Sequence, residues 1–156
     1  MVIFLDTFLV SSTSKRASTP TTLSDQCQEW ILECEEKGHR ILIPGICYYE
    51  ALRELEMRQA TSQVKRLKDF CLQPSRFIPI TREHLDAAAV LWGQARRSGK
   101  STADPKALDG DVILCAQVLS FNLPSADYIV ATTNRKHLSQ FVSCDEWTNI
   151  PPSANL

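Results

Sequence analysis

Four oxygen-bearing side chains lie at the polar ends of apolar runs that are far apart in the sequence. Asp6 follows VIFL, Glu50 follows ILIPGICYY, Asp111 precedes VILCAQVL and Asn134 follows YIVATT. If these runs thread one parallel sheet, their polar ends meet at one edge of it. Carboxylate and amide oxygens, without Cys or His, favour a hard cation such as Mg²⁺ or Mn²⁺. The pattern therefore predicts a metal-dependent enzyme that cleaves phosphoesters.

Two of these residues also have ordinary structural explanations that the sequence leaves open. Asp6 could cap a loop through an Asx turn. Glu50 could lie on a solvated helix face and pair with Arg53 three residues later. The functional interpretation is stronger for the set than for any one residue, because clustered carboxylates repel each other and a bound cation would relieve that repulsion.

The other candidates lie where the pattern predicts helix starts. Asp109 and Asp111 precede a run that is apolar almost all round, which is typical of a buried helix. We expect Asp109 to be the N-cap of this helix and Asp111 to face the edge of the sheet. Thr132 and Thr133 follow the last clear strand. We expect them to support the site, although they and Asn134 could simply cap the next helix.

The spacing of apolar residues predicts strands that alternate with helices. This order is typical of an α/β fold with a mainly parallel sheet of about four to five strands. Strands are predicted at 2–5, 40–44, 76–81, 127–133 and, weakly, within 143–150. Helices are predicted from Leu23 to Gly38, at 46–58, at 61–71, after Thr81, at 110–121 and within 134–140. The helix after Thr81 has a predicted core face of Leu85, Ala88, Ala89, Trp92 and Ala95. Polar loops are predicted at 11–22 and 97–108.

The composition is that of an ordinary globular protein. The 156 residues are 44% hydrophobic and 22% charged, with a net charge of −1, so one domain over residues 1–150 with a tail at 151–156 is expected. No apolar run approaches the roughly 18 residues of a membrane span. The six cysteines show no CxxC pair, which predicts free thiols in a cytoplasmic protein without membrane contact.

The net charge excludes a global nucleic-acid footprint, so any RNA contact requires a local basic patch. Arg97 and Lys100 border the loop before the buried helix, and Arg135 and Lys136 follow Asn134. These four residues are weak candidates for contacts with RNA phosphates, because scattered basic residues are usually solvated surface. The three histidines show no spacing typical of a zinc site, although His137 is near enough to Asn134 to line the site.

The candidate residues occur within four short motifs, namely LDT with Asp6, YYEAL with Glu50, DVILCAQ with Asp111 and ATTNRKHLSQF with Asn134. Their order along residues 2–150 resembles that of the PIN-domain family of nucleases, VapC-like toxins included. Two departures from the family pattern are Phe8 in the first motif and an amide in place of a carboxylate at Asn134.

The resemblance implies a three-layer α/β/α sandwich and an endoribonuclease. It implies that Asp6, Glu50 and Asp111 hold Mg²⁺ or Mn²⁺ and that Asn134 completes the catalytic set. RNA would be the substrate, and a cognate antitoxin and a second copy of the chain are the partners that it implies. The alternative is a catalytically weak or inactive PIN-like module that binds RNA or regulates, which Phe8 and Asn134 favour.

Other enzymes of α/β fold fit the sequence less well. A phosphatase of the haloacid-dehalogenase type needs D-x-D-x-T after the first strand, and LDTFL lacks the second Asp. A dinucleotide-binding enzyme needs a glycine-rich turn, and the chain contains no GxGxxG.

Overall fold

The computed structural model describes residues 1–99 and 105–153. Its centre is a five-stranded sheet in which every pair of neighbours is parallel, with the strand order β3-β2-β1-β4-β5. This confirms the predicted α/β class. The strands are β1 (Val2–Leu5), β2 (Arg40–Pro44), β3 (Phe77–Ile78), β4 (Tyr128–Thr132) and β5 (Cys144–Glu146).

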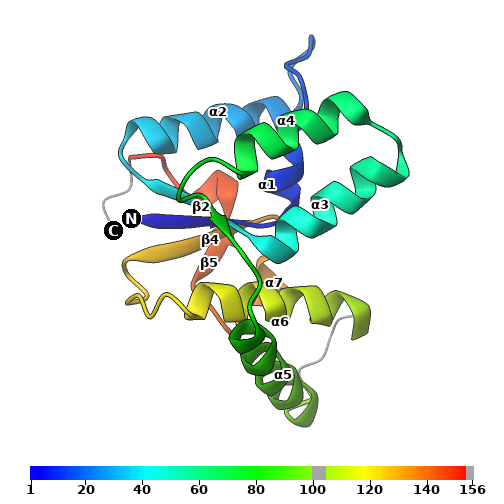
Figure 1. The fold of residues 1–156 in the computed structure, drawn as a ribbon. Coiled ribbons are helices and arrows are strands. Elements are labelled where there is room, and N and C mark those ends of the chain that lie inside the picture. Colours follow the sequence, from blue (N-terminus) through cyan, green and yellow to red (C-terminus); the bar gives the residue numbers. More distant parts are fainter. Residues whose placement is uncertain (100–104, 154–156) are drawn as a thin grey trace.

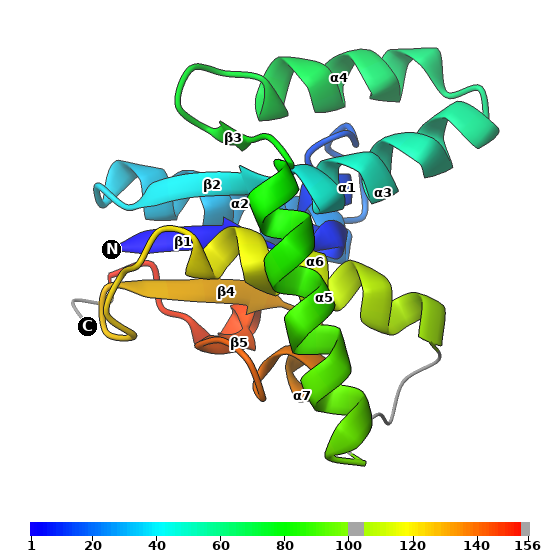
Figure 2. The ribbon, with the colours of Figure 1, turned by 60° about the horizontal axis from the view of Figure 1, so that its bottom comes forward.

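Helices cover both faces of the sheet and form the outer layers of a three-layer sandwich (Figures 1 and 2). In these views α1, α2 and α4 lie on one side, and α6 lies on the other with α5 packed on its outer surface. The helices are α1 (Thr7–Ser12), α2 (Leu23–Glu36), α3 (Gly45–Met57), α4 (Thr61–Cys71), α5 (Arg82–Arg97), α6 (Pro105–Leu119) and α7 (Arg135–Leu138). A short 3-10 turn, Trp147–Asn149, follows β5.

The central strand β1 is buried because three of its residues, Ile3, Phe4 and Leu5, are fully enclosed. It pairs with β2 on one side and β4 on the other, so that Ile3 is opposite both Ile41 and Ile129. Right-handed crossovers place the carboxyl ends of all five strands at one edge of the sheet. The ends of β1 and β4 therefore lie side by side at that edge.

Several helix boundaries follow from local chemistry that the sequence shows. Thr22 and Asp25 form a capping box at the start of α2, and Gly38 follows the helix with a φ of +82°. Thr81 caps α5, and its hydroxyl accepts a hydrogen bond from the backbone N–H of His84. Gly45 begins α3 where a β-carbon would lie 2.8 Å from the carbonyl oxygen of Ile78, so a larger residue would push α3 away from β3.

Three boundaries differ from the prediction. Helix α1 covers residues 7–12, whereas the sequence indicated no helix before 23 and a loop from 11. Helix α6 begins at Pro105, five residues earlier than predicted, because proline is well suited to the first turn of a helix. Strand β3 is only two residues long instead of six, because Pro79 cannot donate a hydrogen bond to a ladder.

The predicted core face of α5 is only partly buried. Ala88 and Ala95 are enclosed, but Leu85 and Trp92 are 49% and 36% exposed. They line an open groove of about 400 Å³ between α5 and α6 together with Val112. The small alanines let α5 approach α6 closely, which leaves the larger side chains at the rim of the groove. In the described residues, no helix combines the length and apolar character that a membrane crossing requires.

Candidate active site

Asp6 lies directly after β1 and is oriented by hydrogen bonds to both of its carboxylate oxygens. One oxygen accepts from the backbone N–H of Thr7 at 2.6 Å, which makes Asp6 the N-cap of α1. The other accepts from the hydroxyl of Thr132, a fully buried residue at the end of β4. The Asx-type role and the site role are therefore compatible, since the cap fixes the side chain at the carboxyl edge of the sheet.

Glu50 lies in the second turn of α3 and faces the start of α1. Its Oε2 accepts a hydrogen bond from the hydroxyl of Thr7 at 2.6 Å. On the opposite side α6 approaches so closely that a β-carbon on Gly110 would lie 2.7 Å from Oε1. Arg53 lies 4.0 Å from Oε1, so the predicted pairing with Glu50 is also present. Because Arg53 is half exposed, this pairing contributes little to stability.

Asp111 lies on α6, and its buried carboxylate oxygen Oδ2 makes no regular hydrogen bond but lies 3.4 Å from Nδ1 of His137, with which it forms an ion pair when the imidazole is protonated. Burial raises the pKa of this carboxyl to about 6. His137 opposes the increase, and the charges of Asp6 and Glu50 contribute to it. A buried carboxylate oxygen without a regular hydrogen bond is unfavourable by about 1–3 kcal/mol. A cation at this position would remove that penalty.

The charges of the three carboxylates act together on one buried thiol, that of Cys47 on α3. Burial holds the pKa of Cys47 well above its usual range, and the charges of Asp6, Glu50 and Asp111 add to the increase. The structure therefore brings together three residues that are 44 and 61 positions apart in the sequence. Within residues 1–99 and 105–153, however, no group of three or more His, Cys, Asp or Glu side chains is arranged to enclose a metal ion directly.

The donors nevertheless fit a hard divalent cation in kind and in charge. Mg²⁺ usually binds through one or two carboxylates and keeps several of its waters, so direct contact with all three carboxylates is not required. The buried oxygen of Asp111, which accepts no regular hydrogen bond, and the mutual repulsion of three acidic side chains are the features that a cation would stabilise. Asp6, Glu50 and Asp111 are therefore the residues that could hold it.

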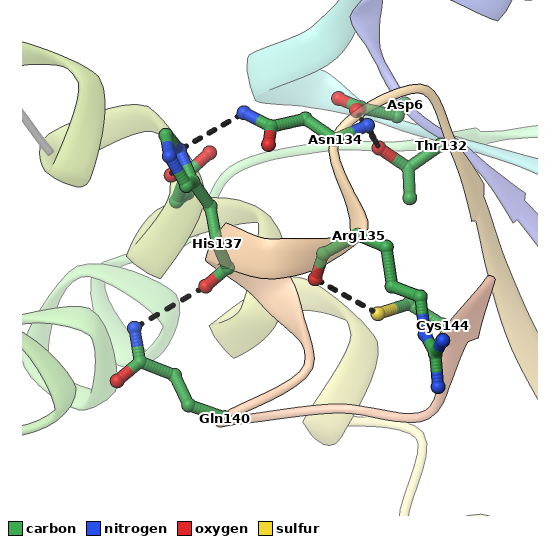
Figure 3. A network of polar contacts seen from close by, with 8 residues as sticks. Asp6, Thr132, Asn134, Arg135, His137, Gln140 and Cys144 are labelled. Carbon is green, nitrogen blue, oxygen red and sulfur yellow. Dashed lines mark hydrogen bonds and ion pairs between the residues drawn. The ribbon is translucent and has the colours of Figure 1, made fainter. Parts of the chain in front are cut away.

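Asn134 and His137 complete the edge of the site on the side of α7 (Figure 3). The backbone N–H of Asn134 donates to the hydroxyl of Thr132 at 2.9 Å, so Thr132 connects Asn134 to Asp6. The side-chain amide of Asn134 makes no cap for α7. It points instead toward the ring of His137, with 2.9 Å between Nδ2 and Nδ1.

The remaining sequence candidates lie farther from this cluster or face elsewhere. Asp109 was expected to be the N-cap of its helix, which is wrong: it lies inside α6, is exposed and lines the groove beside α5. Thr133 is exposed. Arg97 is exposed at the end of α5, and Lys136 is exposed on α7. Lys100 lies outside the described residues.

Arg135 does not face the carboxylates of Asp6, Glu50 and Asp111. Its side chain extends past Cys144 in Figure 3 and lies 3.9 Å from Asp145, away from the amide of Asn134. A role for Arg135 in phosphate binding would therefore require a different side-chain orientation.

Two residues that orient the site received no role from the sequence. Thr7 positions Glu50 through its hydroxyl and Asp6 through its backbone N–H. Gly110 leaves the space that the carboxylate of Glu50 occupies. The Asp-Thr pair in LDT was a signal for Thr7, because a hydroxyl beside a carboxylate at a strand end often orients it. The role of Gly110 depends on the packing of α6 against α3, which no local pattern reveals.

Three solved structures share this architecture over nearly the whole chain. A chain of VapBC2 from Rickettsia felis, bound to a DNA fragment from its promoter, aligns with a TM-score of 0.65 and 15% identity, covering 94% of this chain and 99% of its own. VapBC-1 from nontypeable Haemophilus influenzae gives 0.62 and 14%, covering 96% and 100%. FitAcB from Neisseria gonorrhoeae gives 0.64 and 16%, covering 95% and 99%.

No protein-family model matches the sequence, and no curated protein matches it at a significant level. The likeness is thus one of fold, at identities of 14–16%. The matched chains come from toxin–antitoxin complexes whose toxin component is a PIN domain. Together with the parallel sheet and its two helical layers, the comparison shows that this chain has the PIN-like fold.

Proposed function

We propose that this protein is a metal-dependent endoribonuclease that hydrolyses RNA phosphodiester bonds. The observation that carries the proposal is the convergence of Asp6, Glu50 and Asp111, whose charges all act on the buried thiol of Cys47, with one carboxylate oxygen of Asp111 buried and accepting no regular hydrogen bond. Such a cluster raises the electrostatic energy of the protein, and it is expected where a divalent cation is bound during function.

When bound, Mg²⁺ or Mn²⁺ would polarise a phosphoryl oxygen and lower the pKa of a water for in-line attack. Asp6, Glu50 and Asp111 would hold the cation. Thr7 and Thr132 would restrict the positions of two of these carboxylates, through hydrogen bonds that are already formed. The exposed amide of Asn134 would complete the catalytic set by donating a hydrogen bond to a phosphate oxygen of RNA.

The proposal extends to partners and to the place of action. The matched structures are VapBC and FitAcB complexes, which supports a cognate antitoxin for this chain. A homodimer and a cytoplasmic location belong to the same proposal. Light scattering of the purified chain would measure its oligomeric state. A mass that does not exceed that of the 17.5 kDa chain over a range of concentrations would contradict the homodimer.

The nuclease is tested by incubating the protein with a panel of single-stranded RNAs in Mg²⁺ or Mn²⁺, and separately in EDTA. Asp6→Ala is the matched variant, because it removes a carboxylate at the carboxyl edge without adding bulk. We expect cleavage that requires the cation and is lost in the variant. Cleavage that persists in EDTA or in Asp6→Ala would contradict the proposed site.

A second candidate function is a catalytically weak or inactive PIN-like module that binds RNA or regulates another protein. It is favoured by Asn134 in place of a carboxylate, and by the absence, within the described residues, of three ligands already arranged around one point. Calorimetric titration with Mn²⁺ separates the two functions. An inactive module that has lost its metal site should bind no cation, whereas the nuclease should bind one that is lost in Asp111→Asn.

A further inference from the structure

Tyr49 is an exposed aromatic residue on α3, one position before Glu50. It is 54% exposed, and within the described residues only Trp92, at 36%, is another exposed aromatic residue. The neighbouring Tyr48 shows the usual arrangement, since its ring packs edge-on against Phe77 with 5.4 Å between the ring centroids. Packing in the core therefore does not account for the ring of Tyr49.

Arg53 connects the ring of Tyr49 to the candidate active site. Its guanidinium carbon lies 5.4 Å from the centroid of the Tyr49 ring, and its Nη2 lies 4.0 Å from Oε1 of Glu50. One guanidinium thus contacts both the ring and a carboxylate of the site, which places the ring at the rim of the site. The side chain of Arg53 is 58% exposed, so its charge is accessible to a ligand.

An aromatic ring beside a guanidinium is suited to the two parts of a nucleotide. A base stacks on an exposed aromatic ring whatever the identity of the base, because every base has a π-face. A guanidinium donates paired hydrogen bonds to phosphate oxygens. More than half of Tyr49 is exposed although Arg53 lies over its ring, so the ring keeps surface on which a base can stack.

We propose that Tyr49 and Arg53 hold the nucleotide that flanks the cleaved phosphodiester. The ring of Tyr49 stacks on its base, and the guanidinium of Arg53 binds its phosphate. This inference rests on the proposed function, because it is the contact with Glu50 that places the pair beside the reacting phosphate. No residue of α3 was among the sequence candidates for contacts with RNA, so the pair adds this helix to the RNA-binding surface.

RNA binding is measured in the Asp111→Asn background, so that the RNA remains intact during the measurement. Fluorescence anisotropy of a labelled single-stranded RNA gives the affinity of this protein and of the same protein with Tyr49→Ala, Tyr49→Phe or Trp92→Ala. We expect Tyr49→Ala to weaken binding by about fivefold to a hundredfold, the range of one lost base stack, and Tyr49→Phe to retain the affinity.

Trp92→Ala is the matched control for the loss of an exposed ring. Trp92 is also exposed and also lies beside an arginine, with the guanidinium carbon of Arg96 5.0 Å from its ring. It lines the groove between α5 and α6, however, and not the edge that holds Glu50. We expect this variant to change the affinity for RNA by less than about threefold, in contrast to a lost base stack.

A fluorescent base tests the stacking itself. The emission of 2-aminopurine falls when it stacks on an aromatic ring, so the base is placed at each position of the RNA in turn. We expect strong quenching on binding at a nucleotide that flanks the bond cleaved by the wild type. The quenching should persist in Tyr49→Phe and in Trp92→Ala, and it should disappear in Tyr49→Ala.

The salt dependence of binding separates the role of Arg53 from that of Tyr49. One phosphate contact on single-stranded nucleic acid contributes about 0.7 to the slope of log affinity against log salt concentration. Arg53→Ala should reduce the slope by about this amount. Tyr49→Ala should weaken binding without a change in the slope.

The possible failures can be told apart, provided that circular dichroism shows each variant to be folded. If the wild type cleaves RNA and Tyr49→Ala binds RNA as tightly as Trp92→Ala does, the role of Tyr49 is wrong while the nuclease holds. Quenching that persists in Tyr49→Ala, or a slope that Arg53→Ala does not change, would also overturn the inference. If the wild type neither binds nor cleaves RNA, both the inference and the proposed function are contradicted.

Discussion

Two hydroxyl groups orient the carboxylates of the site. Thr132, which is fully buried, donates to Asp6 and accepts from the backbone N–H of Asn134. Thr7 donates to Glu50. A carboxylate restricted in this way loses less conformational entropy when it binds a ligand, because its rotamer is already selected. The hydroxyls therefore contribute to the site although neither is expected to bind the cation.

Replacing Thr132 by Val tests this role without changing the side-chain volume. The change leaves an oxygen of Asp6 and the N–H of Asn134 without their partners, so we expect a loss of about 1–3 kcal/mol in the free energy of unfolding. We also expect weaker binding of divalent cations. Denaturant titration and calorimetry provide the two measurements. Thr133→Val is the control, because Thr133 is exposed and should change stability by less than about 0.5 kcal/mol.

Asp111 is expected to destabilise the metal-free protein above pH 6. The pKa of this carboxyl is raised from 3.8 to about 6, chiefly by burial. The folded state therefore binds more protons than the unfolded state between these values, and the contribution of this group to stability falls as the pH rises from about 4 to 6. Above pH 6 the unfavourable term is fully present.

Asp111→Asn removes the charge and keeps the shape, so it should stabilise the metal-free protein at pH 8 by about 1–3 kcal/mol. The advantage should shrink as the pH falls from 6.5 toward 4. Denaturant titration of both proteins in EDTA across this range measures the difference. A wild type that is more stable than Asp111→Asn at pH 8, or a difference that does not change with pH, would contradict the assigned environment.

At the scale of elements, the close approach of α6 to α3 defines the position of Glu50. Gly110 has no β-carbon, and the carboxylate of Glu50 occupies the space that such an atom would fill. Gly110→Ala should displace the carboxylate of Glu50, because the atoms that a β-carbon would meet are the flexible end of the Glu50 side chain. It should not unfold the helix, because alanine is favoured over glycine in helices by up to about 1 kcal/mol.

We therefore expect Gly110→Ala to keep or raise the melting temperature while cation affinity and RNA cleavage fall. Gly93→Ala is a matched control, because Gly93 is another helical glycine whose nearest neighbour is the end of a long side chain, Arg97 at 3.1 Å. That variant should gain similar helix propensity without an effect on cleavage. Unchanged cleavage in Gly110→Ala would show that Glu50 does not need its observed position.

Gln117 connects three elements through a fully buried side chain. Its Oε1 accepts from the backbone N–H of Ile46 at 3.2 Å, and its Nε2 donates to the carbonyl oxygen of Ile78 at 2.8 Å. It thereby joins α6 to the start of α3 and the end of β3. Gln117→Leu leaves these backbone groups unpartnered in the core, so we expect a loss of about 2–4 kcal/mol in thermal or denaturant unfolding. A loss below 1 kcal/mol would contradict this structural role.

The elements differ in how well the sequence predicted them. Periodicity identified the strands around residues 3, 42 and 130 and helices α2 to α4, because each buries a continuous apolar face. Helix α1 was missed because it is only six residues long and contains Thr, Val and two Ser, which have low helix propensity. The cap by Asp6 and packing against α2 and α3 stabilise it.

The start of α6 was misplaced for a different reason. The sequence predicts a polar loop at 97–108, with Asp109 as the N-cap of a helix that begins at 110. Pro105 begins the helix instead, so Asp109 and Asp111 both lie in its interior. Asp111 therefore does not cap the helix, and capping cannot explain why its carboxylate is buried.

At the scale of the whole molecule, the strand order assembles the site. Strands β1 and β4 are adjacent at the centre of the sheet, so Asp6 and Thr132 come into contact although they are 126 positions apart in the sequence. Helices α3 and α6 then bring Glu50 and Asp111 to the same edge. The sequence predicted this grouping from the positions of acidic residues at the ends of apolar runs. It could not predict the hydrogen bonds and close approaches, because these depend on the packing between helices.

The same topology explains why the likeness to VapBC and FitAcB chains persists at 14–16% identity. A parallel sheet covered on both faces requires only that apolar residues recur at the right spacing, so many sequences satisfy it. The acidic residues at the carboxyl edge are not required for that packing. The proposed activity therefore depends on these residues and not on the fold alone.

Single-turnover cleavage of labelled RNA by the wild type and by Asp111→Asn, with Mn²⁺ in excess, tests the central claim most directly. Circular dichroism and denaturant titration establish that the variant is folded. We predict cleavage by the wild type and a rate at least about a hundredfold lower in the variant, because loss of a charged ligand weakens both cation binding and transition-state stabilisation. Equal rates for the two folded proteins would contradict the claim that these carboxylates form a metal-dependent nuclease site.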